Sequence, residues 1–129
     1  MKSMALQILT DNTSPNTLSI ALDGQLDTLT ANDLEKSIQT NLQQDTQTLI
    51  FDLQKLSFVS SAGLRVFAKA RKTLKLKNGK VFFTNPTPQV KKVFDIVKAV
   101  PISEVFASTE ELDAYLTFMQ SEVEVEDNQ

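Results

Sequence analysis

Leu49-Ile50-Phe51-Asp52-Leu53, residues 54–59 and then Ser60-Ser61-Ala62-Gly63-Leu64-Arg65 form the stretch that decides the fold. The first segment is a short apolar run, typical of a parallel strand that is covered on both faces. The last segment predicts a helix start, because two serines precede an amphipathic segment and Ser is favoured at helix N-caps. Open α/β sheets usually place their sites at the carboxyl ends of strands. We therefore expect the functional site where this strand meets this helix.

The composition is that of a globular protein with one domain. The chain has 129 residues, of which 41% are hydrophobic and 22% are charged, and its net charge is −3. A negative chain is unlike most nucleic-acid binders, which carry a basic face. Lys and Arg residues do cluster between Arg65 and Lys98, and we interpret them as a solvated helix face.

The chain contains neither cysteine nor histidine. Without them it cannot form a disulfide, a Ser-His-Asp or Cys-His catalytic arrangement, or an ordinary zinc site. A hydrolase using Ser61 would need a lysine base, and the spacing of Lys55 does not argue for one. We expect no cofactor, no metal and no enzymatic activity. The absence of a signal peptide and of a membrane-spanning run predicts a cytoplasmic location.

The hydrophobic pattern predicts an α/β fold with the order ββαβαβαβα and a mixed, mostly parallel sheet. Strands are expected near residues 4–11, 17–22, 49–53, 81–84 and 102–106. Helices are expected from Thr30 as N-cap to Leu42, from the serine pair to residues 78–79, from Pro88 to about residue 98, and from Ser108 to about Gln120. We expect one domain over residues 1–120 and an acidic, disordered tail over residues 121–129.

The serine pair has a simple structural explanation, since one hydroxyl would cap the helix and the other would be incidental. A functional explanation rests on the same geometry. The start of a helix attracts anions through its unpaired N–H groups and its dipole. A hydroxyl at this point could bind a phosphate group or be phosphorylated, which adds about −1.5 to −2 charges.

Five landmarks of the chain resemble the STAS family, the domain of anti-sigma factor antagonists and of sulfate-transporter tails. Residues 56–65 are similar to the family's strand followed by Asp-Ser-small-Gly-Leu at a helix start. The other landmarks are Gly24-Gln25-Leu26-Asp27, Asn78-Gly79-Lys80, Asn85-Pro86 and Val90-Lys91-Lys92-Val93-Phe94. Together they cover most of the chain from Leu6 to Leu116. The chain length favours a free-standing antagonist over a transporter tail.

The resemblance implies a bacterial phosphoprotein that acts in signal transduction and transcription regulation by partner switching. Such an antagonist binds an anti-sigma factor that is also a Ser/Thr kinase, is released when phosphorylated, and is reset by a phosphatase. Ser61 takes the place of the phosphorylated serine. The family has Asp where this chain has Ser60, so Ser60 is the alternative phosphoacceptor. The implied partner-binding residues are Asp27, Ser60, Ser61, Ala62, Gly63, Leu64 and Arg65.

Two other functions are consistent with the same residues. One is a STAS module that binds a nucleotide or another small anionic ligand at the helix start. The other is a partner-switching regulator whose output is not a sigma factor. In either switch we expect the phosphate to act locally, through charge and bulk at the interface, because the flanking strand and helix both carry strong core patterns.

Overall fold

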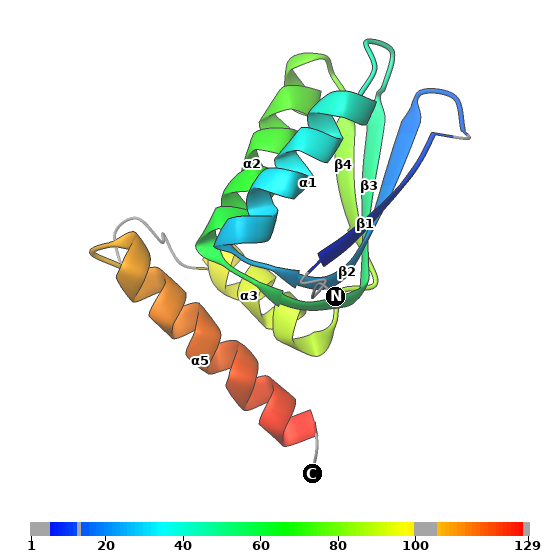
Figure 1. The fold of residues 1–129 in the computed structure, drawn as a ribbon. Coiled ribbons are helices and arrows are strands. Elements are labelled where there is room, and N and C mark those ends of the chain that lie inside the picture. Colours follow the sequence, from blue (N-terminus) through cyan, green and yellow to red (C-terminus); the bar gives the residue numbers. More distant parts are fainter. Residues whose placement is uncertain (1–5, 13, 100–105, 128–129) are drawn as a thin grey trace.

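The computed structural model describes residues 6–12, 14–99 and 106–127, without the side chains of residues 99 and 122–127 (Figure 1). Its sheet has the order β1-β2-β3-β4, in which β1 and β2 are antiparallel and the other neighbours are parallel. The predicted α/β fold with a mixed, mostly parallel sheet is therefore confirmed. The elements are β1 (Leu6–Asp11), β2 (Thr17–Leu26), α1 (Thr28–Asn41), β3 (Thr48–Val59), α2 (Ser61–Leu76), β4 (Lys80–Thr84), α3 (Pro88–Ala99) and α5 (Thr109–Asp127).

The core lies between one face of the sheet and the helices. Alternate residues of β2 and β3 point into it, and α1 and α2 pack side by side over it (Figure 1). The fully buried side chains include Leu18, Ile20, Leu22, Leu49, Phe51 and Leu53. The expectation that β3 is covered on both faces is wrong for its first half. Ile50 and Asp52 alternate with the buried residues and remain partly exposed, because α1 and α2 lie on the opposite face.

Both central strands extend further than their apolar runs. β2 continues past Leu22 to Leu26, and shifts in its register with β3 accompany Gly24, whose φ is 124°. Glycine tolerates this conformation and other residues rarely do, so the strand continues through an irregularity instead of ending. β3 runs to Val59, six residues beyond the apolar run that ends at Leu53.

The helix expected from Thr30 begins earlier, because Asp27 and not Thr30 is its N-cap. The strand expected near residues 102–106 falls mainly outside the described residues, and Phe106 itself belongs to no strand. α5 continues beyond its expected end at Gln120, as far as Asp127. The boundary between a domain over residues 1–120 and a tail stays a prediction.

Candidate functional site

The two parallel central strands end together at one edge of the sheet. Leu26 is the last residue of β2 and lies opposite Val59, the last residue of β3. The backbone N–H of Ser60 donates to the carbonyl of Leu26 at 2.9 Å, which joins the two exits. α1 and α2 both begin here, so two helix N-termini lie at the same edge (Figure 1).

Ser60 is the N-cap of α2, and its extended backbone (φ −98°, ψ 175°) leads from the strand into the helix. Its hydroxyl accepts a hydrogen bond from the N–H of Gly63 at 3.3 Å. Ser60 is only 4% exposed. The simple structural explanation of the serine pair therefore applies to Ser60.

Gly63 allows the first turn of α2 to pack directly on the strand ends. A Cβ at this position would lie 2.6 Å from Cγ of Leu26 and 2.9 Å from Cγ2 of Val59, both fully buried residues. Real Cβ atoms do not approach other carbons this closely. A residue without a side chain is thus required for α2 to begin where it does.

Asp27 caps α1 through its carboxylate. One oxygen accepts hydrogen bonds from the N–H groups of Leu29 and Thr30, each at 3.0 Å. The hydroxyl of Thr30 accepts from the N–H of Asp27 at 2.9 Å, which completes a capping box. Asp27 is therefore at the exit of β2, on the same edge of the sheet as the serine pair.

Ser61 is the first residue of α2 and is bound by a carboxylate from α5. Its hydroxyl donates to Oδ2 of Asp113 at 2.9 Å, and its N–H donates to Oδ1 of the same residue at 2.8 Å. Ser61 is 6% exposed. A carboxylate at a helix N-terminus is electrostatically favourable. Asp113 thus brings a negative group from a distant helix to the N-terminus of α2.

Gln120, seven residues after Asp113 on α5, fixes this helix to the same edge. Its side chain accepts from the N–H of Val59 and donates to the carbonyl of Val59, both at 2.9 Å, and it also donates to Leu116 O at 3.1 Å. Gln120 is 3% exposed, and the apolar side chains around it on α5 are Leu112, Leu116 and Met119. α5 is held by both apolar packing and specific polar contacts.

The structure brings the predicted site residues together at one corner. Ser60, Ser61 and Gly63 are buried, Asp27, Ala62 and Leu64 are partly exposed, and Arg65 is exposed. Sequence analysis missed three residues of this corner, namely Leu29, Asp113 and Gln120. Gln120 could have been noticed as a polar residue on the apolar stripe of α5, whereas nothing local distinguishes Asp113 from Glu110 and Glu111.

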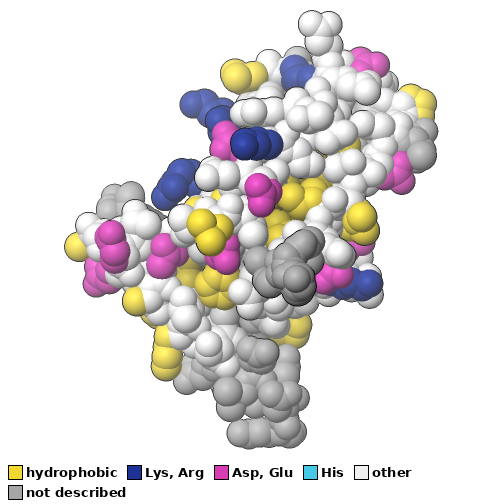
Figure 2. Space-filling view, viewed as in Figure 1, with side chains coloured by type: hydrophobic (Ala, Val, Ile, Leu, Met, Phe, Trp, Pro, Cys, Tyr) yellow, Lys and Arg dark blue, Asp and Glu magenta, His cyan; other side chains and the backbone are white. Residues whose placement is uncertain are grey.

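Charge is distributed unevenly around the corner. Lys and Arg side chains gather over α2, and Asp and Glu side chains gather over the start of α5 (Figure 2), where Glu110 and Glu111 form the first turn. Lys69 of α2 forms an ion pair with Glu35 of α1. An added negative charge at Ser61 would therefore meet acidic groups on the side of α5 and basic groups along α2.

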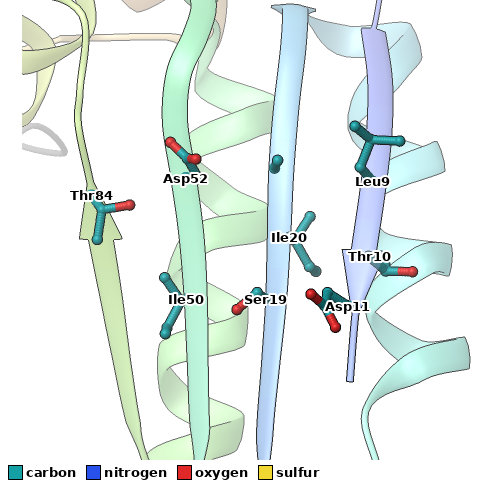
Figure 3. Close-up of a pocket in the computed structure, with 9 residues that line it drawn as sticks. Leu9, Thr10, Asp11, Ser19, Ile20, Ile50, Asp52 and Thr84 are labelled. Carbon is teal, nitrogen blue, oxygen red and sulfur yellow. The ribbon is translucent and has the colours of Figure 1, made fainter. Parts of the chain in front are cut away.

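Ser61 does not line either of two pockets found among the described residues. The first is on the open face of the sheet, where Leu9, Ser19, Ile50, Asp52 and Thr84 point away from the helices (Figure 3). The second is lined by Gln25, Ser57, Phe58, Thr117, Gln120 and Ser121. Neither is lined by Lys or Arg. Within the described ranges, no three carboxylates are grouped so that they could hold a metal ion.

The family model of the STAS domain matches residues 9–112 of this chain. The chain belongs to the STAS domain family. The match includes the serine corner and ends one residue before Asp113, so the carboxylate that binds Ser61 lies just outside the matched residues.

Two relatives of this STAS domain are named as anti-sigma factor antagonists. BtrV of Bordetella bronchiseptica, provisionally named an anti-sigma factor antagonist, is 30% identical over 93 residues, which are 72% of this chain and 80% of BtrV. The anti-sigma F factor antagonist of Lysinibacillus sphaericus is 32% identical over 79 residues, 60% of this chain and 68% of that protein.

Solved structures share the fold. Unphosphorylated SpoIIAA, an anti-sigma factor antagonist, superposes with a TM-score of 0.65 at 24% identity, over 77% of this chain and 93% of SpoIIAA. Phosphorylated SpoIIAA, a Bacillus cell fate determinant, gives 0.61 at 26% identity, over 70% of this chain and 83% of that one. No helix in the described part of this STAS domain is long and apolar enough to cross a membrane.

Proposed function

We propose that this STAS domain is an anti-sigma factor antagonist that binds an anti-sigma factor with Ser/Thr kinase activity and is released when Ser61 is phosphorylated. The observation that carries the proposal is the position of Ser61, the first residue of α2 within the family's Ser-small-Gly-Leu sequence. The names of the two relatives agree with this role. The protein acts in this proposal as a binding partner and a kinase substrate, not as an enzyme, and a phosphatase restores it.

The surface beside Ser61 is suited to a protein partner. Leu29, in the first turn of α1, is 80% exposed although it is a large apolar residue next to the capping Asp27. Leu64 is partly exposed and Arg65 is exposed on the first turns of α2. Arg is enriched at protein interfaces, and an exposed leucine is stabilised when a partner covers it. The proposed contact surface comprises Asp27, Leu29, Ala62, Leu64 and Arg65 around the serine pair.

A phosphate on Ser61 would oppose binding through its charge. A dianion at a closely packed interface must be desolvated, and it is repelled by any acidic group of the partner. Each 1.4 kcal/mol lost changes the affinity about tenfold, so a few kcal/mol are sufficient for release. A small anionic ligand at the same helix start would meet the carboxylate of Asp113, which argues against ligand binding as the function.

The test is calorimetric titration of the cognate anti-sigma factor kinase with variants at this corner. Ser61→Ala should bind as tightly as the unmodified protein, also after incubation with ATP. Ser61→Glu should fold and bind more weakly, although one carboxylate carries less charge than phosphate. Ser60→Ala is the matched control and should still be released by ATP. Retention of Ser60→Ala after ATP, together with release of Ser61→Ala, would assign the switch to Ser60.

A further inference from the structure

The hydroxyl of Ser61 is covered in the folded protein. Ser61 is 6% exposed, and both its N–H and its hydroxyl donate to the carboxylate of Asp113. A kinase must bring its nucleotide close to this oxygen, in line with it. The geometry of the described residues therefore conflicts with direct phosphorylation, and the segment responsible for the conflict is α5.

A phosphate on Ser61 and the docked position of Asp113 exclude each other. Phosphorylation removes the hydroxyl proton that Asp113 accepts and places a dianion against its carboxylate. Glu110, three residues before Asp113 and on the same side of α5, adds to the repulsion. Arg65, one turn after Ser61 on α2, is exposed and forms no ion pair within the described ranges, so it is positioned to bind the phosphate instead.

The two ends of the α5 contact differ in character. Near Gln120 the contact is uncharged and combines hydrogen bonds to Val59 with the buried Leu116 and Met119. Near Asp113 only Leu112 is buried besides the carboxylate contact, and Thr109, Glu110 and Glu111 are exposed. The start of α5 is thus the part that a charge at Ser61 would loosen first.

We propose that α5 is a lid on Ser61 and that Asp113 is its latch. The start of α5 lifts to admit the kinase, while Gln120 keeps the helix attached to β3. Transfer then forms the bond between Oγ of Ser61 and the γ-phosphorus of ATP, breaks the bond from that phosphorus to the β–γ bridging oxygen, releases ADP, and passes the hydroxyl proton to a base of the kinase. The phosphate keeps the lid lifted. This regulation rests on the proposed function of Ser61.

The proposal extends the effect of phosphorylation beyond the corner expected from sequence. Sequence analysis confined the effect to Ser61 and its interface, because no neighbouring segment was expected to have two positions. The hydrogen bonds of Asp113 make the last helix part of the corner. If α5 acts as a lid, phosphorylation should change the amide exchange of the start of α5 and leave that of α1 unchanged.

The test uses phosphoserine inserted at position 61 during translation, and it therefore requires no kinase. Amide hydrogen exchange is compared between proteins with Ser61 and with phosphoserine. Exchange in residues 110–116 should become at least roughly tenfold faster, because a lost hydrogen bond to a charged group has about that effect and an undocked single helix frays. Exchange in α1 should not change, and α3 is not a reference because it packs against α5. Unchanged exchange in residues 110–116, or an equal rise in all helices, would overturn the proposal.

Asp113→Asn tests the latch itself. Its amide can donate to the phosphate while its oxygen still accepts from the N–H of Ser61, so it should slow the exchange of α5 in the phosphoserine protein. Glu110→Gln is the matched control and should not restore protection to the same degree. Fast exchange in the Asp113→Asn phosphoserine protein would show that Asp113 is not the latch. Since no partner takes part in these measurements, their failure would leave the proposed binding function standing, and failure of binding would leave the lid standing.

Discussion

Gln120 pairs with both backbone polar groups of Val59, accepting from its N–H and donating to its carbonyl at 2.9 Å each. An amide side chain here replaces the neighbouring strand that the end of β3 lacks. The amide of Gln120 and the N–H and carbonyl of Val59 are all buried. A buried polar group that loses its partner lowers the stability of the fold. The attachment of α5 to the sheet therefore depends on this residue.

Gln120→Ala should lower the free energy of unfolding by about 1–3 kcal/mol, since it leaves the N–H and the carbonyl of Val59 without partners. Urea denaturation measures the change. Thr117→Ala is the matched control, because Thr117 is an exposed residue of the same helix. Equal stability of the two variants would show that the contact between Gln120 and Val59 does not hold α5.

Gly63→Ala should destabilise the fold by about 1–3 kcal/mol, the usual cost of forcing an extra carbon into a packed core. The new Cβ would lie 2.6 Å from Leu26 and 2.9 Å from Val59, neither of which has free space around it. Thermal unfolding followed by circular dichroism is suited to the comparison. A melting temperature at or above that of the unchanged protein would mean that α2 can shift outward without loss.

Asp27 has a structural role that must be separated from any contact with the partner. Asp27→Asn should keep the stability nearly unchanged, because Asn caps helices about as well as Asp, whereas Asp27→Ala should cost about 0.5–2 kcal/mol. If the carboxylate also contacts the partner, Asp27→Asn should weaken binding at constant stability. Binding equal to that of the unchanged protein would limit Asp27 to capping α1.

Leu29 and Leu76 form a matched pair of exposed leucines, 80% and 81% exposed at the start of α1 and the end of α2. Leu29→Ser should reduce the affinity for the anti-sigma factor about tenfold, the effect of losing roughly 1.4 kcal/mol of apolar contact. Leu76→Ser should not affect it. An equal loss of affinity in both variants would show that the partner does not bind specifically at the corner of Ser61.

Because the sequence contains no cysteine, a single introduced thiol can report how accessible position 61 is. A thiol introduced by Ser61→Cys should react with a soluble disulfide reagent at least roughly tenfold more slowly than one introduced by Arg65→Cys, because buried positions react only through local opening. Arg65 is exposed on the same helix. Equal rates would show that α5 does not cover position 61 in solution.

The pattern of apolar residues was sufficient to predict the sheet, its central strands and the start of α2, because these depend on local periodicity and on Ser at an N-cap. Asp27 lies on the same edge as Ser61 because parallel strands end at a common edge. The sequence pattern misplaced the cap of α1, because Thr30 and Asp27 are both good N-caps and only the continuation of β2 to Leu26 decides between them.

The contacts of α5 could not be predicted from local pattern. Asp113 resembles the other acidic residues at the start of this helix, and its importance comes from the packing of α5 against a segment 52 residues away in sequence. The partial exposure of Ile50 and Asp52 was missed for a related reason. Whether an apolar run is covered on one face or on two depends on where the helices pack.

The central claim is that phosphorylation of Ser61 releases the protein from its partner. The most direct measurement is incubation with the cognate anti-sigma factor kinase and ATP, followed by intact mass, peptide fragmentation and titration of the purified product. The account predicts one phosphate, located on Ser61, and an affinity at least roughly tenfold lower, equivalent to about 1.4 kcal/mol. A phosphate found only on Ser60, or a phosphoprotein that binds as tightly as the unmodified one, would contradict it.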